Sequence, residues 1–256
     1  MRETFETNDV AYRSRLSVRQ FGAAALAGLT DAETYCLSKV PSGRRGTILD
    51  IGVGAGRTTG PLAALFRRYT GIDYSPALIE QARKNFPEQH FIAMDARQLG
   101  SQIGYDCVMF SYNGIDYVSY EDRIGLFNTL FRVLNPGGFF IYSTHNAEYD
   151  RVPAYQQTLL LPELFRPARS LRGLFRRIAN FHRQSKDQAG RYCVVNDPGL
   201  SFGLLTTYVN IAVEIGALRA MGFETVTTIG ASRSAPGYSH ADPWVYIAVR
   251  KPGPAR

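Results

Sequence analysis

Three glycines separated by single residues lie between an apolar segment and the start of a helical pattern. In ILDIGVGAGRTT the segment ends at Asp50, the turn holds Gly52, Gly54 and Gly56, and Arg57 follows. Glycines in a strand-to-helix turn let the backbone approach a ligand closely, and the helix start offers unpaired N–H groups. The dinucleotide fingerprint needs a third glycine where this chain has Arg57, so that type of nucleotide site is excluded.

A second acidic residue ends the next predicted strand. The segment YTGID ends in Asp73, 17 residues beyond Gly56. In an open parallel sheet the carboxyl ends of the strands face the ligand crevice, and a carboxylate there can accept two hydroxyl hydrogen bonds at once. The alternative is that Asp73 only caps the helix that begins after Ser75 and Pro76.

Polar residues also follow the later strands of the predicted sheet. They are Asp95 and Ala96 after the third strand, Ser111, Tyr112, Asn113 and Asp116 after the fourth, and His145 and Asn146 after the fifth. Because parallel strands end at the same edge of a sheet, these side chains are expected to lie near the glycine turn.

The elements that must position these residues alternate between predicted strands and predicted helices. Residues 46–143 alternate short apolar runs with helical patterns, which is typical of βαβ units and a mostly parallel sheet covered on both faces. Residues 5–40 predict one or two leading helices. A helix over 206–223 and strands over 224–230 and 244–250 are expected to complete the fold.

The α/β rhythm breaks in a basic insertion over residues 147–200. Residues 151–191 contain nine basic and two acidic residues, which accounts for the whole formal charge of +7, and much of this stretch reads as a basic amphipathic helix. The rest of the chain is balanced, so a general affinity for polyanions is not indicated. The expected division is 1–45 (helical lid), 46–146 (ligand-binding core), 147–200 (basic helical insertion) and 201–256 (end of the core sheet).

In its spacing, Asp-x-Gly-x-Gly-x-Gly resembles motif I of the class I S-adenosylmethionine (SAM) dependent methyltransferases. The segments YTGID, FIAMDARQL, YDCVMFSYN and LFNTLFRVLNPGGFFIYST resemble the later motifs of that family in order and distance. The resemblance covers residues 46–145, with a closing helix and strand pair at 206–250. It implies a Rossmann-like, doubly wound, seven-stranded sheet whose last two strands are antiparallel to each other, and SAM as the cofactor.

The resemblance also implies roles for single residues. Asp73 would bind the ribose hydroxyls, Asp95 and Ala96 would contact the adenine, and the methionine end of SAM would lie after the fourth strand. The expected cofactor-binding residues are Asp50, Gly52, Gly54, Gly56, Arg57, Asp73, Tyr74, Asp95, Ala96, Ser111, Tyr112 and Tyr12. Asp50 has an alternative role, which is to orient the glycine loop without touching the cofactor.

Methyl transfer needs an oriented acceptor and, for some acceptors, a base. His145 is the first candidate, because an imidazole titrates near neutral pH and strand ends face the crevice. His240, just before the last strand, is a second candidate base, and Asn113 is a candidate for orienting the acceptor. An amine that arrives neutral needs no base, so a reaction without one is also an open alternative.

The acceptor class is narrowed by motifs that this chain lacks. Ser111-Tyr112-Asn113-Gly114 stands where base-modifying enzymes carry Asn/Asp-Pro-Pro-aromatic, no pair of catalytic cysteines is present, and no acidic cluster for a metal is evident. We therefore expect metal-free transfer to a small organic acceptor, anionic or aromatic, at N or O. The insertion is expected to form a lid over the acceptor whose arginines are a solvated face; a helix lying on a membrane surface is an alternative for this segment. The alternatives for the whole protein are an RNA or other nucleic-acid methyltransferase recruited by these arginines and a non-catalytic SAM-binding regulator.

The three cysteines are far apart and lack neighbours at metal-ligand spacing, so neither a disulfide framework nor a zinc site is expected. The sequence shows no apolar run of about 18 residues that would cross a bilayer. These features predict a soluble cytoplasmic protein.

Overall fold

The computed structural model describes residues 27–100, 104–153, 178–196 and 204–254. Parallel strands form the centre of its sheet in the order β3-β2-β1-β4-β5. Their bounds are β1 Thr47–Ile51, β2 Arg68–Asp73, β3 His90–Ala93, β4 Tyr105–Phe110 and β5 Leu134–Asn146. All five carboxyl ends meet at one edge, as the alternation of apolar runs and helical patterns predicts.

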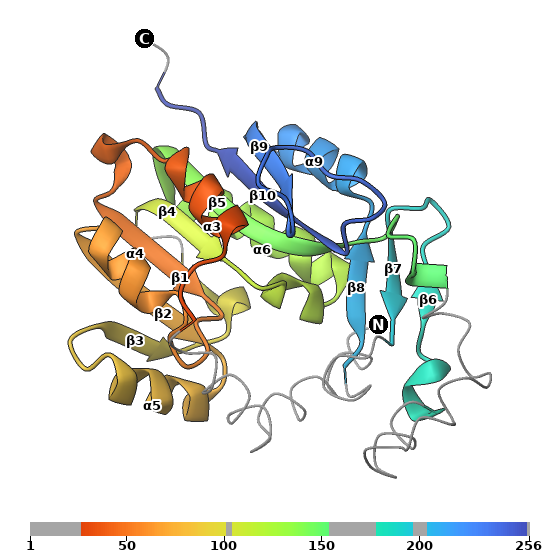
Figure 1. Ribbon diagram of the computed structural model, residues 1–256, viewed down its shortest axis with the longest axis horizontal. Coiled ribbons are helices and arrows are strands. Elements are labelled where there is room, and N and C mark those ends of the chain that lie inside the picture. Colours follow the sequence, from red (N-terminus) through yellow and green to blue (C-terminus); the bar gives the residue numbers. More distant parts are fainter. Residues whose placement is uncertain (1–26, 101–103, 154–177, 197–203, 255–256) are drawn as a thin grey trace.

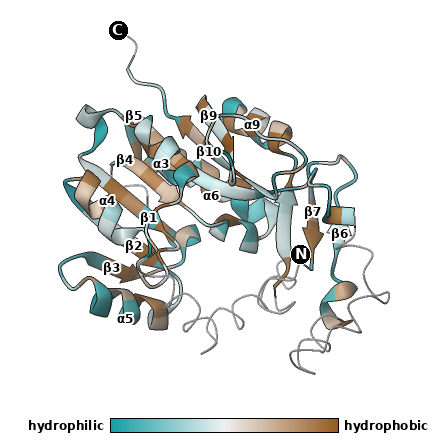
Figure 2. Cartoon of the chain, in the orientation of Figure 1, coloured by the Kyte–Doolittle hydropathy of each residue, from teal (hydrophilic) through white to brown (hydrophobic). Residues whose placement is uncertain are grey.

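Helices cover both faces of this sheet (Figure 1). They are α3 Asp31–Ser38, α4 Thr59–Leu65, α5 Pro76–Asn85, α6 Tyr120–Val133 and α9 Ile211–Ala220, with short 3-10 turns η1 Ser42–Arg44, η2 Ala96–Gln98 and η3 Gly114–Tyr117. Successive strand residues point to opposite faces. In β1, Ile48 joins the buried cluster under α3, α4 and α5, whereas Leu49 joins the cluster under α6 and α9. Strands such as β1 and β7 (Tyr192–Val195) are accordingly mostly apolar (Figure 2).

Two antiparallel strands close the core. β9 (Glu224–Gly230) pairs with β10 (Trp244–Arg250), and β10 pairs with β5 along residues 139–145. With the parallel strands they make the seven-stranded sheet that the family resemblance implies, and its last two strands are antiparallel to each other as expected.

The described sheet has three further strands beyond this core: β6 Ser185–Lys186, β7 and β8 Thr206–Val209. The insertion was expected to be helical, but its described part contains β6 and β7, while residues 178–181 are helical. Most of the predicted basic helix lies outside the described residues.

The expectation of a continuous helix over 206–223 is wrong at its start, because α9 begins only at Ile211. The four residues of β8 are β-branched or aromatic and fully buried, which favours a strand. Asn210 then caps α9, its side chain accepting the N–H of Val213 at 3.1 Å.

Strand β8 lies where β4 stops. Tyr142 of β5 pairs with Phe110, the last residue of β4, and three positions later His145 pairs with Tyr208 of β8. His145 also pairs with Trp244 on its other side. The β6-β7-β8 unit therefore extends the sheet past the carboxyl end of β4 and forms a wall beside the edge where ligands bind in this architecture.

Candidate functional site

A cavity of about 860 Å³ opens at the carboxyl ends of β1, β2, β3 and β4. This volume lies within the range of small-molecule sites. The cavity brings together ten of the residues predicted from the sequence: Asp50, Gly52, Gly54, Arg57, Asp73, Tyr74, Asp95, Ala96, Ser111 and Tyr112. Gly56 is in the turn but not in the cavity wall, and Tyr12 lies outside the described residues.

The glycines of the turn serve two different purposes. Gly54 has φ +57° and no atom within 4 Å of the position a Cβ would take, so this side of the backbone is open for a ligand. At Gly56, with φ +104°, a Cβ would lie 2.6 Å from Cε2 of Phe86. Gly54 thus leaves space next to the cavity, whereas Gly56 lets α5 pack against the turn.

Asp73 is held as a hydrogen-bond acceptor at the end of β2. Oδ2 accepts the N–H of Gly54 at 3.0 Å and Oδ1 accepts the N–H of Ser75 at 2.8 Å. Burial raises the pKa of Asp73 to about 6, against the opposing effect of these two N–H groups. Since Ser75 itself occupies the N-cap of α5, Asp73 is not the helix cap; it ties the glycine turn to the end of β2.

The carboxylate of Asp50 takes no part in the hydrogen bonds between Asp73 and the glycine turn. Its Oδ2 accepts the hydroxyls of Thr58 at 2.5 Å and Tyr69 at 2.8 Å, and the carboxylate is almost wholly buried. Burial raises its pKa to about 6 despite these two bonds. The geometry favours the alternative in which Asp50 orients the loop, although it does so through side-chain hydroxyls and not through backbone N–H groups.

Asp95 is already paired. Its carboxylate caps η2 by accepting the N–H of Arg97 at 2.9 Å, and Oδ2 lies 2.6 Å from a guanidinium nitrogen of the same residue. Burial acts to raise the pKa of Asp95, but the hydrogen bonds from Arg97 hold it below its usual value. Arg97 also reaches Asp122 of α6 at 3.0 Å, which fixes η2 and with it Ala96 along the cavity wall.

Arg57 forms an ion pair that sequence reasoning missed. Its guanidinium contacts Glu33 at 2.5 Å, the carbonyl of Gly28 at 2.6 Å and the hydroxyl of Ser111 at 3.2 Å, and the Tyr112 ring lies 4.6 Å away. Glu33 is fully buried and also hydrogen bonds with Ser111. The pair connects α3, the glycine turn and the end of β4. The only local signal for Glu33 is the capping box that it forms with Thr30.

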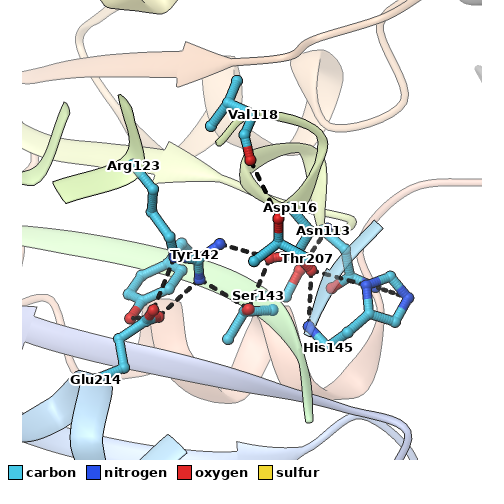
Figure 3. A network of polar contacts seen from close by, with 10 residues as sticks. Asn113, Asp116, Val118, Arg123, Tyr142, Ser143, His145, Thr207 and Glu214 are labelled. Atoms are coloured by element: carbon cyan, nitrogen blue, oxygen red, sulfur yellow. Dashed lines mark hydrogen bonds and ion pairs between the residues drawn. The ribbon is translucent and has the colours of Figure 1, made fainter. Parts of the chain in front are cut away.

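A second polar cluster surrounds the end of β5 (Figure 3). Asp116 of η3 accepts at Oδ2 from both the backbone N–H and Nδ1 of His145, each at 2.7 Å. Its Oδ1 accepts from Arg123 at 2.6 Å and from the hydroxyl of Thr144 at 2.7 Å. Arg123 in turn makes two bonds of 2.7 Å to Glu214 of α9. Sequence reasoning noted Asp116 as a polar residue but missed Arg123 and Glu214, which come from separate helices.

Asn113 lies between this cluster and the cavity. Both Tyr112 and Asn113 have positive φ, +57° and +60°, which is uncommon for residues other than glycine and marks a conformation that the surroundings must hold. The N–H of Asn113 donates to Ser143 at 2.8 Å, and its Nδ2 lies 3.5 Å from Nε2 of His145. Its buried Oδ1 has no partner among the described residues.

The other candidate base, His240, lies in an exposed turn. Its Nδ1 is 2.8 Å from the carbonyl oxygen of Glu148, and it is not among the described residues that line the cavity. No group of three His, Cys, Asp or Glu side chains in the described ranges is arranged to hold a metal ion. In the same ranges, no helix is long and apolar enough to cross a membrane.

Comparisons with known proteins agree with this geometry. Residues 48–138 match the family model described as a methyltransferase domain. A trans-aconitate 2-methyltransferase of Escherichia coli O157:H7 is 33% identical over 104 residues, 40% of this chain and 40% of that protein. The chain thus matches about two fifths of the length of this curated relative.

Solved structures show the same fold over most of the chain. A SAM-dependent methyltransferase from Clostridium acetobutylicum superposes with a TM-score of 0.59 at 13% identity, covering 87% of this chain and 92% of that one. The N-methyltransferase NodS from Bradyrhizobium japonicum, in complex with S-adenosylhomocysteine, gives a TM-score of 0.52 at 16% identity, covering 86% and 85%.

Proposed function

We propose that the chain is a class I SAM-dependent methyltransferase that transfers a methyl group from SAM to a small organic acceptor, a proposal supported by the match of residues 48–138 to the methyltransferase-domain model. SAM supplies a methyl group on a sulfonium, so the protein mainly has to bind it, orient the acceptor and exclude competing reactions.

The position of Asp73 carries the proposal. The glycine turn, Asp73 and the Asp95–Ala96 segment line one cavity in the order that the ribose and adenine of SAM require. Each oxygen of Asp73 accepts one backbone N–H and keeps a lone pair that can accept a ribose hydroxyl. The open space beside Gly54 leaves room for the cofactor to lie against the backbone.

A small acceptor is favoured by the comparison with a named relative. The relative named for trans-aconitate is itself named for a small acceptor. His145 is the first candidate base and Asn113 the first candidate to orient the acceptor.

Calorimetry with SAM and with S-adenosylhomocysteine tests cofactor binding. Saturable binding is expected for both ligands, and its absence would remove the premise. Transfer is then tested by incubating the protein with methyl-labelled SAM and either a metabolite pool or total RNA. We expect label in small molecules; label confined to RNA would favour the nucleic-acid alternative and contradict the proposal.

A further inference from the structure

We propose that the amino edge of the sheet, opposite the cofactor cavity, is a docking surface for the phosphate backbone of a nucleic-acid duplex. This surface is separate from the methyl-transfer site, so the inference does not rest on the proposed function. It gives a role to a feature that methyl transfer does not use, which is the gathering of positive charge at one edge of the core.

The amino edge is formed by the segments that lead from each helix into the next strand. Arg68 of β2 pairs with Thr47 of β1, so the starts of these two strands lie side by side. Because β10 runs antiparallel to β5, its last residue, Arg250, pairs with Phe139 and returns to the same edge. Six strand ends thus form one line in the order β3-β2-β1-β4-β5-β10, and at about 4.8 Å per strand this line is roughly 24 Å long.

The charges of the core are divided between the two edges of the sheet. The described segments of the amino edge are 38–47, 66–69, 83–90, 104–106, 131–137, 219–224 and 250–254, and they hold eleven basic and three acidic residues. The basic edge consists of Lys39, Arg44, Arg45, Arg67, Arg68, Arg83, Lys84, Arg132, Arg219, Arg250 and Lys251, and the acidic residues are Glu88, Asp106 and Glu224. The opposite edge holds carboxylates such as Asp50, Asp73 and Asp95. The charge balance of the sequence outside the insertion is therefore an average over two edges of opposite sign.

Most of the positive charge of the basic edge is not compensated within the described ranges. Only Lys84 and Arg250 form ion pairs there, with Glu80 and Glu224. The other nine cations have no carboxylate partner among the described residues. Like charges held close together repel one another, and a bound polyanion would relieve this repulsion.

Two of the guanidinium groups are held in place by backbone oxygens. Arg44 donates to the carbonyl of Pro136 at 2.8 Å and Arg45 to that of Val40 at 3.2 Å. These bonds fix the groups on the edge and leave their charge unpaired. Arg67 and Arg68 follow at the neighbouring strand end, and both are exposed to solvent.

A second cavity, of about 500 Å³, opens within the same edge. Arg44 and Arg250 both line it, together with Glu224, which leaves one net positive charge on its wall. At Gly137, with φ +80°, a Cβ would lie 2.6 Å from a guanidinium nitrogen of Arg44, so glycine allows this close approach. A planar guanidinium matches the geometry of phosphate oxygens, and the cavity can therefore receive a phosphate group.

The apolar side chains near the basic edge indicate which polyanion fits. Surfaces that lie on anionic membranes bury an apolar face, and single-strand sites stack bases on aromatic rings. The exposed apolar side chains near this edge are Leu65 of α4 and Val226 of β9, which belong to opposite ends of the row, and the exposed ring of Tyr112 follows β4 at the other edge. Among the described residues this leaves contacts to phosphates, which position a duplex without reading its sequence.

The dimensions of the sheet make the duplex an anchor and not the methyl acceptor. Each strand of a duplex carries a phosphate about every 3.4 Å along the axis, so several phosphates can contact a row of roughly 24 Å. The five residues of β1 separate the two edges by roughly 17 Å. A duplex on the amino edge is therefore out of reach of a methyl group held in the cofactor cavity.

Fluorescence anisotropy with a labelled RNA duplex of about 20 base pairs, and with a DNA duplex of the same sequence, tests the docking surface. For about five phosphate contacts, log Kd should rise with log salt concentration with a slope of about 4.5 between 50 and 200 mM salt. A second, unrelated sequence should bind within about threefold of the first. The double variant Arg67→Gln/Arg68→Gln should lower the slope by about 2 and raise Kd about 10- to 60-fold at 100 mM salt.

Two other variants make the test specific to this edge. Arg132→Gln lies at the other end of α6 from the cofactor cavity and should raise Kd up to about 8-fold, which keeps the test open if the double variant does not fold. The matched control is Arg151→Gln/Arg183→Gln, which removes the same charge from two exposed arginines of the insertion. It should bind the duplexes within about threefold of wild type. A loss in this control as large as that in Arg67→Gln/Arg68→Gln would assign the duplex to the insertion and overturn the proposal.

Several other results would also overturn the proposal. They are the absence of saturable duplex binding, a Kd that does not change with salt, and an edge variant that binds like wild type. Tighter binding to polyglutamate, or to vesicles with about one third phosphatidylserine, would assign the edge to a different partner. A duplex that accepts label from methyl-labelled SAM would contradict the role as an anchor. A chain that binds the duplex but not SAM would contradict only the proposed function, so the two failures are distinguishable.

Discussion

Replacing Asp73 by asparagine should weaken SAM binding by a predictable amount. The ribose diol would donate one hydrogen bond to each oxygen of the carboxylate, and bonds to a charged group contribute about 1.5–3 kcal/mol each. Asparagine keeps one acceptor oxygen and loses the charge, so one bond is lost and the other becomes a weaker neutral bond. We expect a loss of about 2–4 kcal/mol, which is roughly a 30- to 1000-fold higher Kd.

Titration calorimetry of SAM against wild type and Asp73→Asn measures this loss, with circular dichroism showing that the variant is folded. The matched control is Asp106→Asn, the same chemical change at the start of β4. Asp106 accepts the N–H of Thr47 and the amide of Asn135, each at 2.9 Å, at the opposite edge of the same sheet. An Asp73→Asn Kd within threefold of that of Asp106→Asn would refute the assignment of the ribose site.

Three further outcomes are expected. Burial raises the pKa of Asp73 to about 6, and only the ionised carboxylate accepts both ribose hydroxyls. The affinity for SAM should therefore be flat above pH 7 and fall about tenfold per pH unit below pH 6. Calorimetry of Asp73→Asn should show no such fall. Gly56→Ala should lower the free energy of unfolding in urea by about 2–4 kcal/mol, because the new Cβ would meet Phe86 and the backbone has a positive φ. Gly54→Ala should lower it by only about 1 kcal/mol but should weaken SAM binding. Equal unfolding midpoints for the two variants would contradict the packing argument. Arg123→Met leaves two buried carboxylates without their cation and should lower the free energy of unfolding by about 3–5 kcal/mol, so an unchanged midpoint would count against the buried network.

The sequence predicted those parts of the site whose signal lies within a few consecutive residues. The glycine turn and Asp73 follow strands whose apolar character is local, and the order of motifs places them at one edge. The strand β8 was missed because its residues run into the pattern of α9, separated only by the cap at Asn210. A short strand of this kind is selected by burial against β5 and β7, which no local pattern contains.

The partners of the predicted residues could not be found in this way. Arg57 was expected to touch the cofactor, and it lines the cavity, but its charge is paired with Glu33, 24 positions earlier. The pairing of Asp116 with His145 spans 29 positions, and that of Arg123 with Glu214 spans 91. Such pairs depend on how separate helices pack on the sheet. No local spacing or periodicity in a single sequence indicates which residues will pair in this way.

The double pairing of His145 has a consequence for how this protein can diversify. On one side β5 is bonded to β10 along seven residue pairs, but β8 joins it through only two, at His145 and Asn146. The β6-β7-β8 unit thus joins the sheet only at the carboxyl end of β5, and it contacts the core further through Tyr192, which stacks on Tyr120, and Thr207, which donates to the carbonyl of Val118. Given the proposed function, we expect an exchanged unit to change the choice of acceptor, while the cofactor side of the sheet, several strands away, keeps its geometry.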